Sequence, residues 1–143
     1  MKLDELKARA RRIPEEILTQ GDLAVADELI DPECCHHTPQ PISPGIEGVK
    51  AWVQALRRAF LDLRAVVEDE IAERDTVVQR LTLGGTHEGP LFGLLPTGRR
   101  VEWQEVDILR VGANGKFTET WSYWDRHDLL QQLGAPPGIE EDN

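Results

Sequence analysis

The order of its sequence patterns predicts an α+β fold for this chain of 143 residues. Apolar residues recur at helical spacing through residues 2–60. From residue 63 the pattern changes to runs rich in Val, Ile, Thr and aromatic residues, which are typical of β-strands. Helices followed by a series of antiparallel strands indicate that the helices pack on one face of a curved sheet.

Three helices come first, over residues 2–20, 23–30 and 46–60. Pro14 interrupts the first, so we expect a kink there or a fresh start with the proline in its first turn. Gly21 can end this helix, and Asp22 can cap the next one. The third helix carries an apolar face formed by Val49, Trp52, Val53, Leu56 and Phe60.

Four antiparallel strands are expected next, over residues 63–73, 76–87, 99–111 and 115–125. The GANG sequence at 112–115 predicts a hairpin turn between the last two. A short helix over 126–134 follows them, and a further short strand near residues 33–38 is expected among the early helices. This pattern predicts one domain over residues 1–135 and a flexible acidic tail over 136–143.

Composition excludes several classes of partner. The formal net charge of −10 disfavours nucleic acid and anionic membranes, which attract basic surfaces. Residues 1–16 are charged throughout, unlike a secretion signal, and no apolar run reaches membrane-spanning length. Cys34 and Cys35 are adjacent, a poor arrangement for a mutual disulfide. We therefore expect a cytoplasmic protein with reduced thiols.

The last hairpin holds the residues most suggestive of chemistry. With a three-residue loop at 113–115, Gly112 faces Lys116. Acids mixed with aromatics on one face are typical of a cavity lining, since a dry core would exclude the acids. A two-residue loop would shift the pairing by one and dissolve this shared face. The predicted pairs are Trp103 with Asp125, Glu105 with Tyr123, and Asp107 with Trp121.

Asp125 is the best candidate for a proton shuttle, because it ends the aromatic strand WSYWD. An acid beside aromatics in a closed cavity loses hydration, which raises its pKa toward neutrality. The alternative is that Asp125 only caps the helix that follows it.

The histidines give weaker signals. His87 is a lone histidine in a strand, where a structural role is more common than a catalytic one. His36 and His37 are neighbours, so only one of them can face inward from an extended segment. The chain has no H-x-H, H-x-x-x-H or C-x-x-C spacing, so we expect no metal, and it lacks the G-x-S-x-G sequence of serine hydrolases.

The glycine-rich stretch GGTHEGPLFGLLPTGRR, residues 84–100, is not a phosphate-binding loop, because no helix pattern follows it. We interpret it as a long hairpin connection between two strands. Its apolar residues would form a lid at the cavity mouth or pack in the core: Leu91, Phe92, Leu94 and Leu95.

Several segments together resemble a known family. They are TQGDLAVADEL at 19–29, His37 before Pro39, G-x-E-G at 45–48, G-T-H-x-G at 85–89, P-T-G-R at 96–99, V-D-I-L-R at 106–110, E-x-W-x-x-x-D at 119–125 and LLQQLG at 129–134. In order and spacing they resemble the SnoaL-like polyketide (ester) cyclases of the nuclear transport factor 2-like superfamily. The resemblance covers about residues 13–134.

The resemblance implies a conical α+β barrel, also described as cystatin-like, in which a strongly bent sheet wraps around helices and encloses a pocket. It implies intramolecular aldol-type ring closure of a polyketide ester without metal or organic cofactor, and a homodimer or larger homo-oligomer. This chain departs from the family in having Thr120 where a histidine often precedes the tryptophan, and Cys34-Cys35-His36 before His37.

The resemblance also implies roles for individual residues. Asp125 would be the acid/base, and His87 and His37 would hydrogen-bond the enolate oxygen, with a protonated Glu105 or Asp107 as a further donor. The alternatives are a non-catalytic small-molecule binding protein, or an isomerase or epoxide hydrolase of the same fold. The expected substrate-binding residues are Trp103, Glu105, Asp107, Trp121, Tyr123, Phe92 and Trp52.

Overall fold

The predicted α+β class is confirmed by the computed structural model, which describes residues 1–135. The tail predicted over 136–143 lies outside the described residues. No helix within residues 1–135 is long and apolar enough to span a membrane. The elements are α1 (Leu3–Arg12), the π-helical segment η1 (Ile13–Thr19), α2 (Leu23–Leu29), β1 (Ile30–His37), α3 (Gly45–Ala59), β2 (Arg64–Glu73), β3 (Thr76–Thr86), β4 (Arg100–Val111), β5 (Phe117–Trp124) and α4 (Arg126–Gln132).

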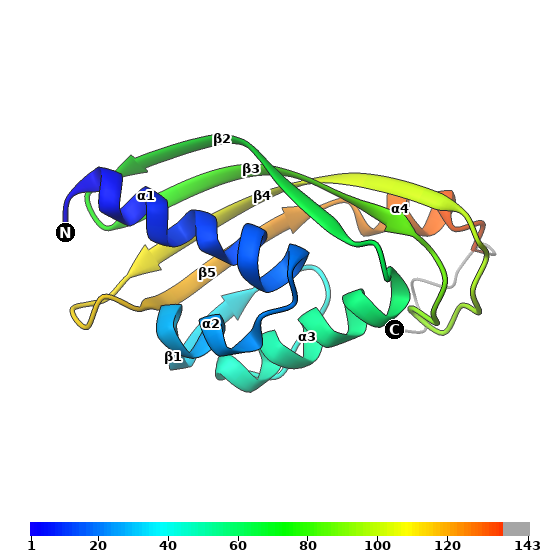
Figure 1. Ribbon diagram of the computed structural model, residues 1–143, viewed down its shortest axis with the longest axis horizontal. Coiled ribbons are helices and arrows are strands. Elements are labelled where there is room, and N and C mark those ends of the chain that lie inside the picture. Colours follow the sequence, from blue (N-terminus) through cyan, green and yellow to red (C-terminus); the bar gives the residue numbers. More distant parts are fainter. Residues whose placement is uncertain (136–143) are drawn as a thin grey trace.

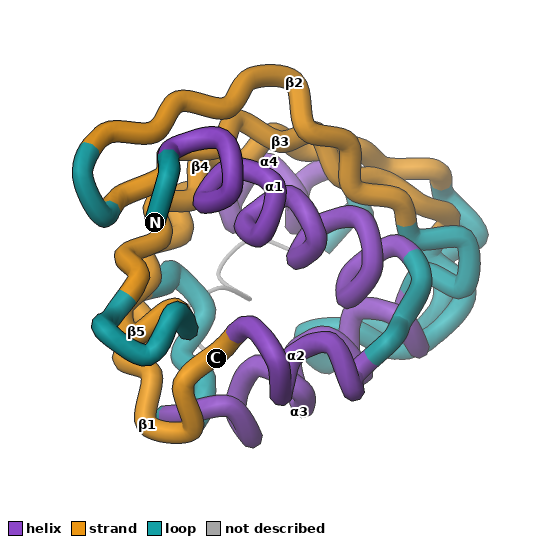
Figure 2. Tube along the Cα trace, turned by 60° about the vertical axis from the view of Figure 1, so that its left-hand side comes forward, coloured by secondary structure: helices purple, strands orange, loops and turns teal. Residues whose placement is uncertain are grey.

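The five strands form one curved sheet in the order β1-β5-β4-β3-β2 (Figure 1). Strand β1 runs parallel to β5, and all other neighbours are antiparallel. The short strand expected near residues 33–38 is β1, and it forms one edge of the sheet. The sheet bends around α1, η1, α2 and α3, which lie on its concave side (Figure 2).

The first helix changes its winding where Pro14 enters it. Proline has no N–H to donate, so the regular i→i−4 pattern loses a bond at this point. The chain continues as the wider η1, in which the Thr19 hydroxyl donates to the Pro14 carbonyl at 2.9 Å. Gly21 then ends the helix with a positive φ of 74°, and the Asp22 carboxylate caps α2 by accepting from the Ala24 N–H.

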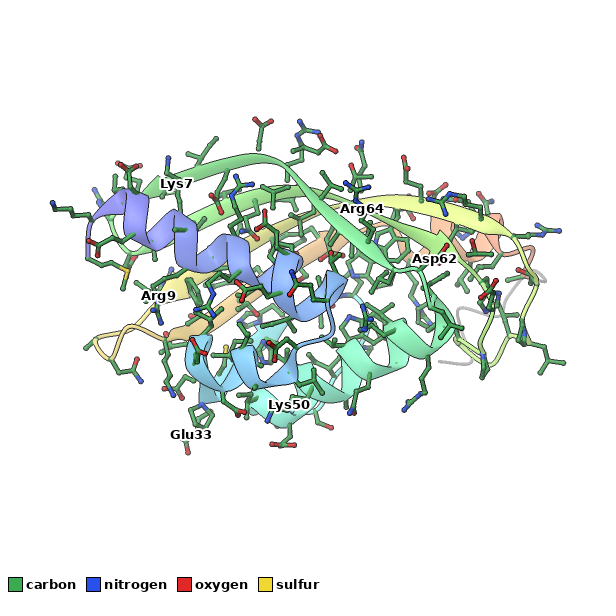
Figure 3. The ribbon with its side chains drawn as sticks, in the orientation of Figure 1. Lys7, Arg9, Glu33, Lys50, Asp62 and Arg64 are labelled. Atoms are coloured by element: carbon green, nitrogen blue, oxygen red, sulfur yellow. The ribbon has the colours of Figure 1, made fainter. Side chains whose placement is uncertain are left out.

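The core fills the space between the helices and the concave face of the sheet. Leu81 and Leu83 of β3 and Phe60 at the end of α3 are fully buried there. Charged side chains point outward, as Lys7, Glu33 and Lys50 do in Figure 3. Asp62, in the turn between α3 and β2, accepts hydrogen bonds from the Thr86 N–H at 2.7 Å and the Thr86 hydroxyl at 2.9 Å. These bonds tie the turn to the end of β3.

The β4–β5 hairpin has the predicted turn but a different register. The Gly112 N–H donates to the Lys116 carbonyl at 2.8 Å, as the three-residue loop requires. Val111 then opposes Phe117, whereas Arg110 opposes Glu119, so Thr118 is an extra residue. This β-bulge moves every later pair by one position.

The predicted pairing is therefore wrong by one residue on β5. Glu105 opposes Trp124, and Asp107 opposes Ser122. Trp121 and Tyr123 lie on the convex outer face, where Tyr123 is 57% exposed, and they do not share a face with the two acids. The face of β5 that looked simply polar, with Thr120 and Ser122, turns inward instead.

The glycine-rich stretch is a hairpin connection that docks on the end of α3. The N–H groups of Glu88 and Gly89 both donate to the Ala59 carbonyl, at 2.9 and 3.1 Å. Leu91 packs in the core, and Leu95 is 80% exposed, so the apolar residues divide between core and surface. The connection passes so close to α3 that a Cβ atom on Gly89 would overlap the Arg58 carbonyl oxygen.

Replacing Gly89 by alanine should therefore lower the free energy of unfolding by about 1–3 kcal/mol, the usual cost of overpacking. The clash involves backbone on both sides, so a rotamer change cannot relieve it. Urea denaturation measures the change. Glu88→Ala, at the exposed neighbouring position, is the control and should stay within about 0.5 kcal/mol of the wild type. Equal stability of the two variants would contradict the close approach.

Candidate active site

A pocket lies between the helices and the concave face of the sheet, with about 110 Å³ of open space. This is room for several water molecules, since one needs about 10–15 Å³ of such space. Most of the lining is apolar, from η1, α3 and the sheet. The lining side chains that can do chemistry or stack on a ligand are His36, Trp52, Glu105, Asp107, Thr120, Ser122 and Trp124.

Two carboxyl groups from β4 face each other in this pocket. Glu105 and Asp107 are two residues apart on one strand, so both side chains point to the same side. Their side chains hydrogen-bond each other, and Asp107 also bonds Ser122. The Trp103 indole N–H donates to Glu105 Oε1 at 3.4 Å. Both carboxyl groups belong to the lining of the pocket.

Burial raises the pKa of both acids. Loss of hydration is the largest cause for each, and the adjacent Asp107 charge raises the pKa of Glu105 further. For Asp107 the hydrogen bonds from Glu105 and Ser122 oppose the rise. The pair therefore holds a proton to higher pH than an ordinary carboxyl does.

One oxygen of the pair is free to act on a ligand. Asp107 Oδ1 is buried and has no hydrogen-bond partner within residues 1–135. Buried polar atoms nearly always have a partner, so an unpaired carboxylate oxygen in a pocket wall is a candidate contact for a substrate. The sequence predicted a ligand-facing role for Glu105 and Asp107, and both do line the pocket.

Aromatic rings form the wall beside the acids. The rings of Trp52 and Trp124 stack at 6.3 Å between centroids, and Phe92 from the glycine-rich connection lies 6.3 Å from Trp52 and 6.4 Å from Trp124. Trp103 lies behind Trp124 at 6.4 Å, and it is almost fully buried. Trp52 lines the pocket, whereas Phe92 and Trp103 contact the ring cluster without lining the pocket.

Of the two neighbouring histidines, His36 directs its imidazole toward the pocket. Its Nδ1 accepts from the Thr120 hydroxyl at 2.8 Å, and its Nε2 donates to the Gly45 carbonyl at 3.1 Å. Burial lowers the pKa of His36, so the ring is neutral near pH 7. His37 borders the pocket, but its ring stacks on Trp121 on the outer face and its Nε2 bonds Glu119.

His87 lies in the core, not in the pocket lining. It is fully buried against Phe60, with 5.9 Å between ring centroids. Its Nδ1 accepts from the Thr97 N–H at 3.2 Å, which places the proton of the neutral ring on Nε2. Burial lowers the pKa of His87, and a Gly89 backbone group offsets only part of this effect. The histidine thereby links the two ends of the glycine-rich connection through its bond to Thr97.

Asp125 lies at the exposed start of α4. Its Oδ1 accepts from the Asp128 N–H at 2.9 Å, which confirms the capping alternative. It is not among the residues that line the pocket. Its proposed action as acid/base remains a prediction, which a substitution described below tests.

His36, Thr120, Ser122 and Trp124 line the pocket, although the sequence did not predict them there. The predicted pairing turns Thr120, Ser122 and Trp124 outward, and the bulge at Thr118, which leaves little trace in the sequence, reverses this. A usable signal was the run Thr118-x-Thr120-x-Ser122, since hydroxyl side chains suit a polar pocket wall. His36 has the same strand parity as the buried Cys34, which the structure shows to face inward.

A bent, mainly antiparallel sheet around helices, with acids and aromatics lining an internal pocket, is the nuclear transport factor 2-like fold. Residues 8–133 match the sequence profile of the SnoaL-like polyketide cyclases. The chain belongs to this family, as its motifs indicated.

Relatives and solved structures agree with this assignment. The chain is 34% identical to nogalonic acid methyl ester cyclase of Streptomyces nogalater over 115 residues, which is 77% of this chain and 84% of that protein. It is 31% identical to aklanonic acid methyl ester cyclase DnrD of Streptomyces peucetius over 110 residues, 76% of this chain and 74% of that protein.

Among solved structures, TsrD from Streptomyces laurentii superposes with a TM-score of 0.85 and 28% identity, covering 95% of this chain and 99% of its own. IdmH from Streptomyces antibioticus superposes with a TM-score of 0.77 and 30% identity, covering 92% and 99%. These matches extend over nearly the whole described chain, so the fold assignment includes every element that builds the pocket.

Proposed function

We propose that this protein closes a ring in a polyketide ester by intramolecular aldol-type addition, with Asp107 as the base and Glu105 as its proton-sharing partner. The observation that carries the proposal is the carboxyl pair in an aromatic-walled pocket, with Asp107 Oδ1 left without a protein partner. Two acids whose pKa values are raised and separated are suited to giving and taking protons near neutrality.

In the proposed reaction, Asp107 Oδ1 takes a proton from the carbon next to a carbonyl group. The resulting enolate attacks a second carbonyl of the same molecule, which forms one C–C bond and leaves an alkoxide. The proton held by Glu105 neutralises that alkoxide, and the proton on Asp107 restores the pair. Every atom of the substrate remains in the product.

The substrate class follows from the wall and from the relatives. Trp52 and Trp124 offer flat apolar surfaces that suit an aromatic ring system. The named relatives are cyclases of nogalonic acid methyl ester and aklanonic acid methyl ester, and we extend that class of polyketide methyl ester to this chain. Because the open space is small, we infer that only the reacting end of the substrate enters the pocket.

Asp107 replaces Asp125 as the proposed base because of their positions. Asp125 is exposed and already caps α4, whereas Asp107 has a free oxygen inside the pocket. His87 and His37 are not assigned to the enolate in this proposal, because the first lies in the core outside the pocket lining and the second bonds Glu119.

The experiment uses nogalonic acid methyl ester and aklanonic acid methyl ester in D₂O. Ring closure should give a product of unchanged atomic composition but different retention, and α-proton abstraction should introduce deuterium even where closure fails. Binding of the ester, seen as thermal stabilisation, with neither exchange nor product would support the binding-protein alternative. An unrelated epoxide turned over instead would point to the hydrolase alternative.

A further inference from the structure

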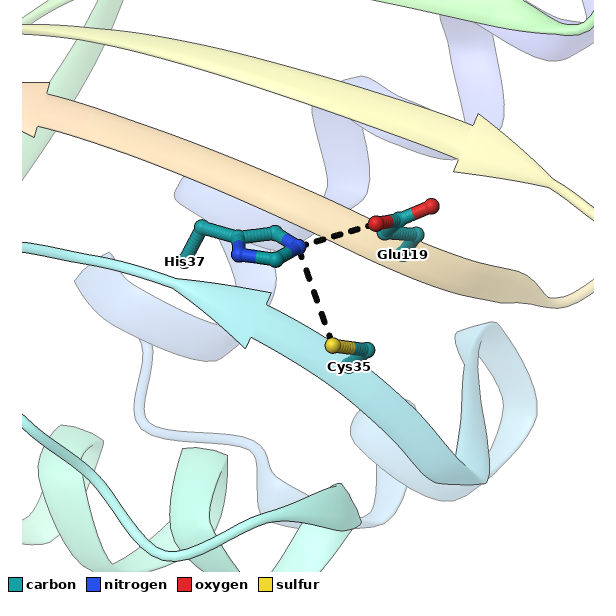
Figure 4. A group of neighbouring side chains, drawn as sticks. All are labelled: Cys35, His37 and Glu119. Atoms are coloured by element: carbon teal, nitrogen blue, oxygen red, sulfur yellow. Dashed lines mark hydrogen bonds and ion pairs between the residues drawn. The ribbon is translucent and has the colours of Figure 1, made fainter.

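The outer face of the sheet carries a second cluster of reactive side chains, on the side opposite the pocket. Cys35 and His37 are two residues apart on β1, so they point to the same side, and Glu119 of β5 is paired with Cys35 across the sheet. Figure 4 shows the three side chains meeting between the strands. His36 and Thr120, the residues of opposite parity, face the pocket.

The spacing of the three ligand atoms suits a small metal ion. Cys35 Sγ lies 3.7 Å from His37 Nε2, which lies 2.8 Å from Glu119 Oε2. All three atoms lie within 4.8 Å of one another. Tetrahedral zinc, with Zn–S of about 2.3 Å and Zn–N or Zn–O of about 2.0–2.1 Å, requires separations of roughly 3.3–3.6 Å between ligand atoms. The Cys35–His37 separation is close to this range, and the His37–Glu119 pair must open slightly.

The surroundings hold these ligands in place. The His37 ring stacks on Trp121 at 5.3 Å with an interplanar angle of 16°. Arg110 bonds the other oxygen of Glu119, Oε1, at 3.2 Å, and its guanidinium lies 5.1 Å above the Trp121 ring. Partners of this kind fix the orientation of metal ligands and leave Glu119 Oε2 and His37 Nε2 directed at Cys35.

We propose that Cys35, His37 and Glu119 form a binding site for a borderline-soft divalent cation such as Zn²⁺, with solvent as the fourth ligand. A thiolate, an imidazole and a carboxylate are the ligand types that zinc takes, and the thiolate disfavours Mg²⁺ and Ca²⁺. The thiolate and carboxylate neutralise the ion, while Arg110 pairs with the other carboxylate oxygen of Glu119. The ion would link the edge strand β1 to β5.

The expectation of no metal rested on the absence of H-x-H, H-x-x-x-H and C-x-x-C spacings. None of these includes the C-x-H spacing of Cys35 and His37. Alternation in a strand aligns residues i and i+2, and the third ligand comes from residue 119, far along the chain. The site is independent of the proposed ring closure, because Cys35 and Glu119 do not line the pocket, and the His37 ring bonds Glu119 and not a pocket acid.

Titration of the purified protein with Co²⁺ tests the proposal, because a cysteine thiolate bound to Co²⁺ gives a charge-transfer absorption band that carboxylates and imidazoles do not. We expect the band to saturate at one Co²⁺ per chain and to disappear when Zn²⁺ displaces the cobalt. Zn²⁺ should also raise the melting temperature, since an ion that binds the folded state stabilises it.

The adjacent cysteine provides a matched control. Cys34 is buried and has the opposite strand parity to Cys35 and His37, so its thiol points into the core and away from the proposed site. Cys34→Ala should keep the band, and Cys35→Ser should abolish it. His37→Gln and Glu119→Gln should weaken Co²⁺ binding by at least the roughly 10–100-fold that loss of a supporting partner costs.

Two results would overturn the proposal. One is a wild-type titration without the thiolate band, and the other is a band that survives in Cys35→Ser but is lost in Cys34→Ala. Cys35 is exposed, so its serine variant should fold, and circular dichroism verifies this. Deuterium exchange in the polyketide ester does not depend on the outcome, which separates failure of the metal site from failure of the proposed function.

Discussion

Replacing Asp107 by asparagine should lower the rates of ring closure and of α-proton exchange by about 10²–10⁴-fold, the usual contribution of a general base. The amide has the shape of the carboxylic acid but cannot take the proton. The protein should still fold, and its melting temperature should rise, because the variant no longer buries an ionisable carboxyl whose pKa is raised by loss of hydration. Rates and melting temperature are measured on the same preparation.

Asp125→Asn is the matched control. Asparagine caps helices about as well as aspartate, so α4 should remain intact. If Asp107 is the base, this variant should turn over the ester at close to the wild-type rate. Loss of activity in Asp125→Asn with retention in Asp107→Asn would return the role to Asp125, as the family resemblance implied. The two variants carry the same chemical change, so a difference between them reports position alone.

The helices and strands could be predicted closely because local signals mark them. Pro14, Gly21 and Asp22 act through backbone geometry and capping, which depend on few neighbours. The hairpin turn was also correct, because Gly115 supplies the positive φ of 79° that the turn needs. In each case the physical cause lies within a few residues of the feature.

The side of the sheet on which each β5 residue lies could not be predicted in this way. A single extra residue, Thr118, reverses the inward and outward faces of the rest of the strand. Bulges are selected by packing across the whole sheet, and Thr118 resembles any other strand residue in composition. The acids on β4 were placed correctly because their own alternation with Trp103 does not depend on the partner strand.

The two clusters on this sheet are a consequence of that same alternation. Strands β1 and β5 present His36, Thr120 and Ser122 to the pocket and Cys35, His37 and Glu119 to the outside. A resemblance of motifs identifies the residues that a family shares, but it does not show on which face of the sheet each residue lies. The structure separates them into an inner group suited to proton transfer and an outer group suited to a metal ion.

The direction in which stability changes with pH should identify the carboxyl pair. In the folded protein the pKa values of Glu105 and Asp107 are raised above their ordinary values. The folded state therefore holds protons more tightly than the unfolded state, and stability should fall as pH rises from the ordinary carboxyl range through the raised pKa values. Ring closure should rise as Asp107 becomes ionised and fall again once Glu105 loses its proton, because the proposed reaction needs both forms.

The double variant Glu105→Gln/Asp107→Asn should remove this fall, so its melting temperature should exceed that of the wild type at neutral pH and approach it at low pH. Each kcal/mol gained corresponds to roughly 2–8 °C.

Asp62→Asn is the control, because the pKa of Asp62 is shifted in the opposite direction and its contribution to stability changes with pH in the opposite way. Hydrogen bonds from the backbone N–H and hydroxyl of Thr86 lower the pKa of Asp62, so its contribution is present above the ordinary aspartate pKa and is lost as pH falls through the lowered value. Removing Asp62 should therefore reduce stability at neutral pH and leave the fall caused by the pair unchanged. A wild-type melting temperature that does not decrease between the ordinary carboxyl range and neutral pH, or a double variant that follows the wild type, would contradict a buried proton-sharing pair.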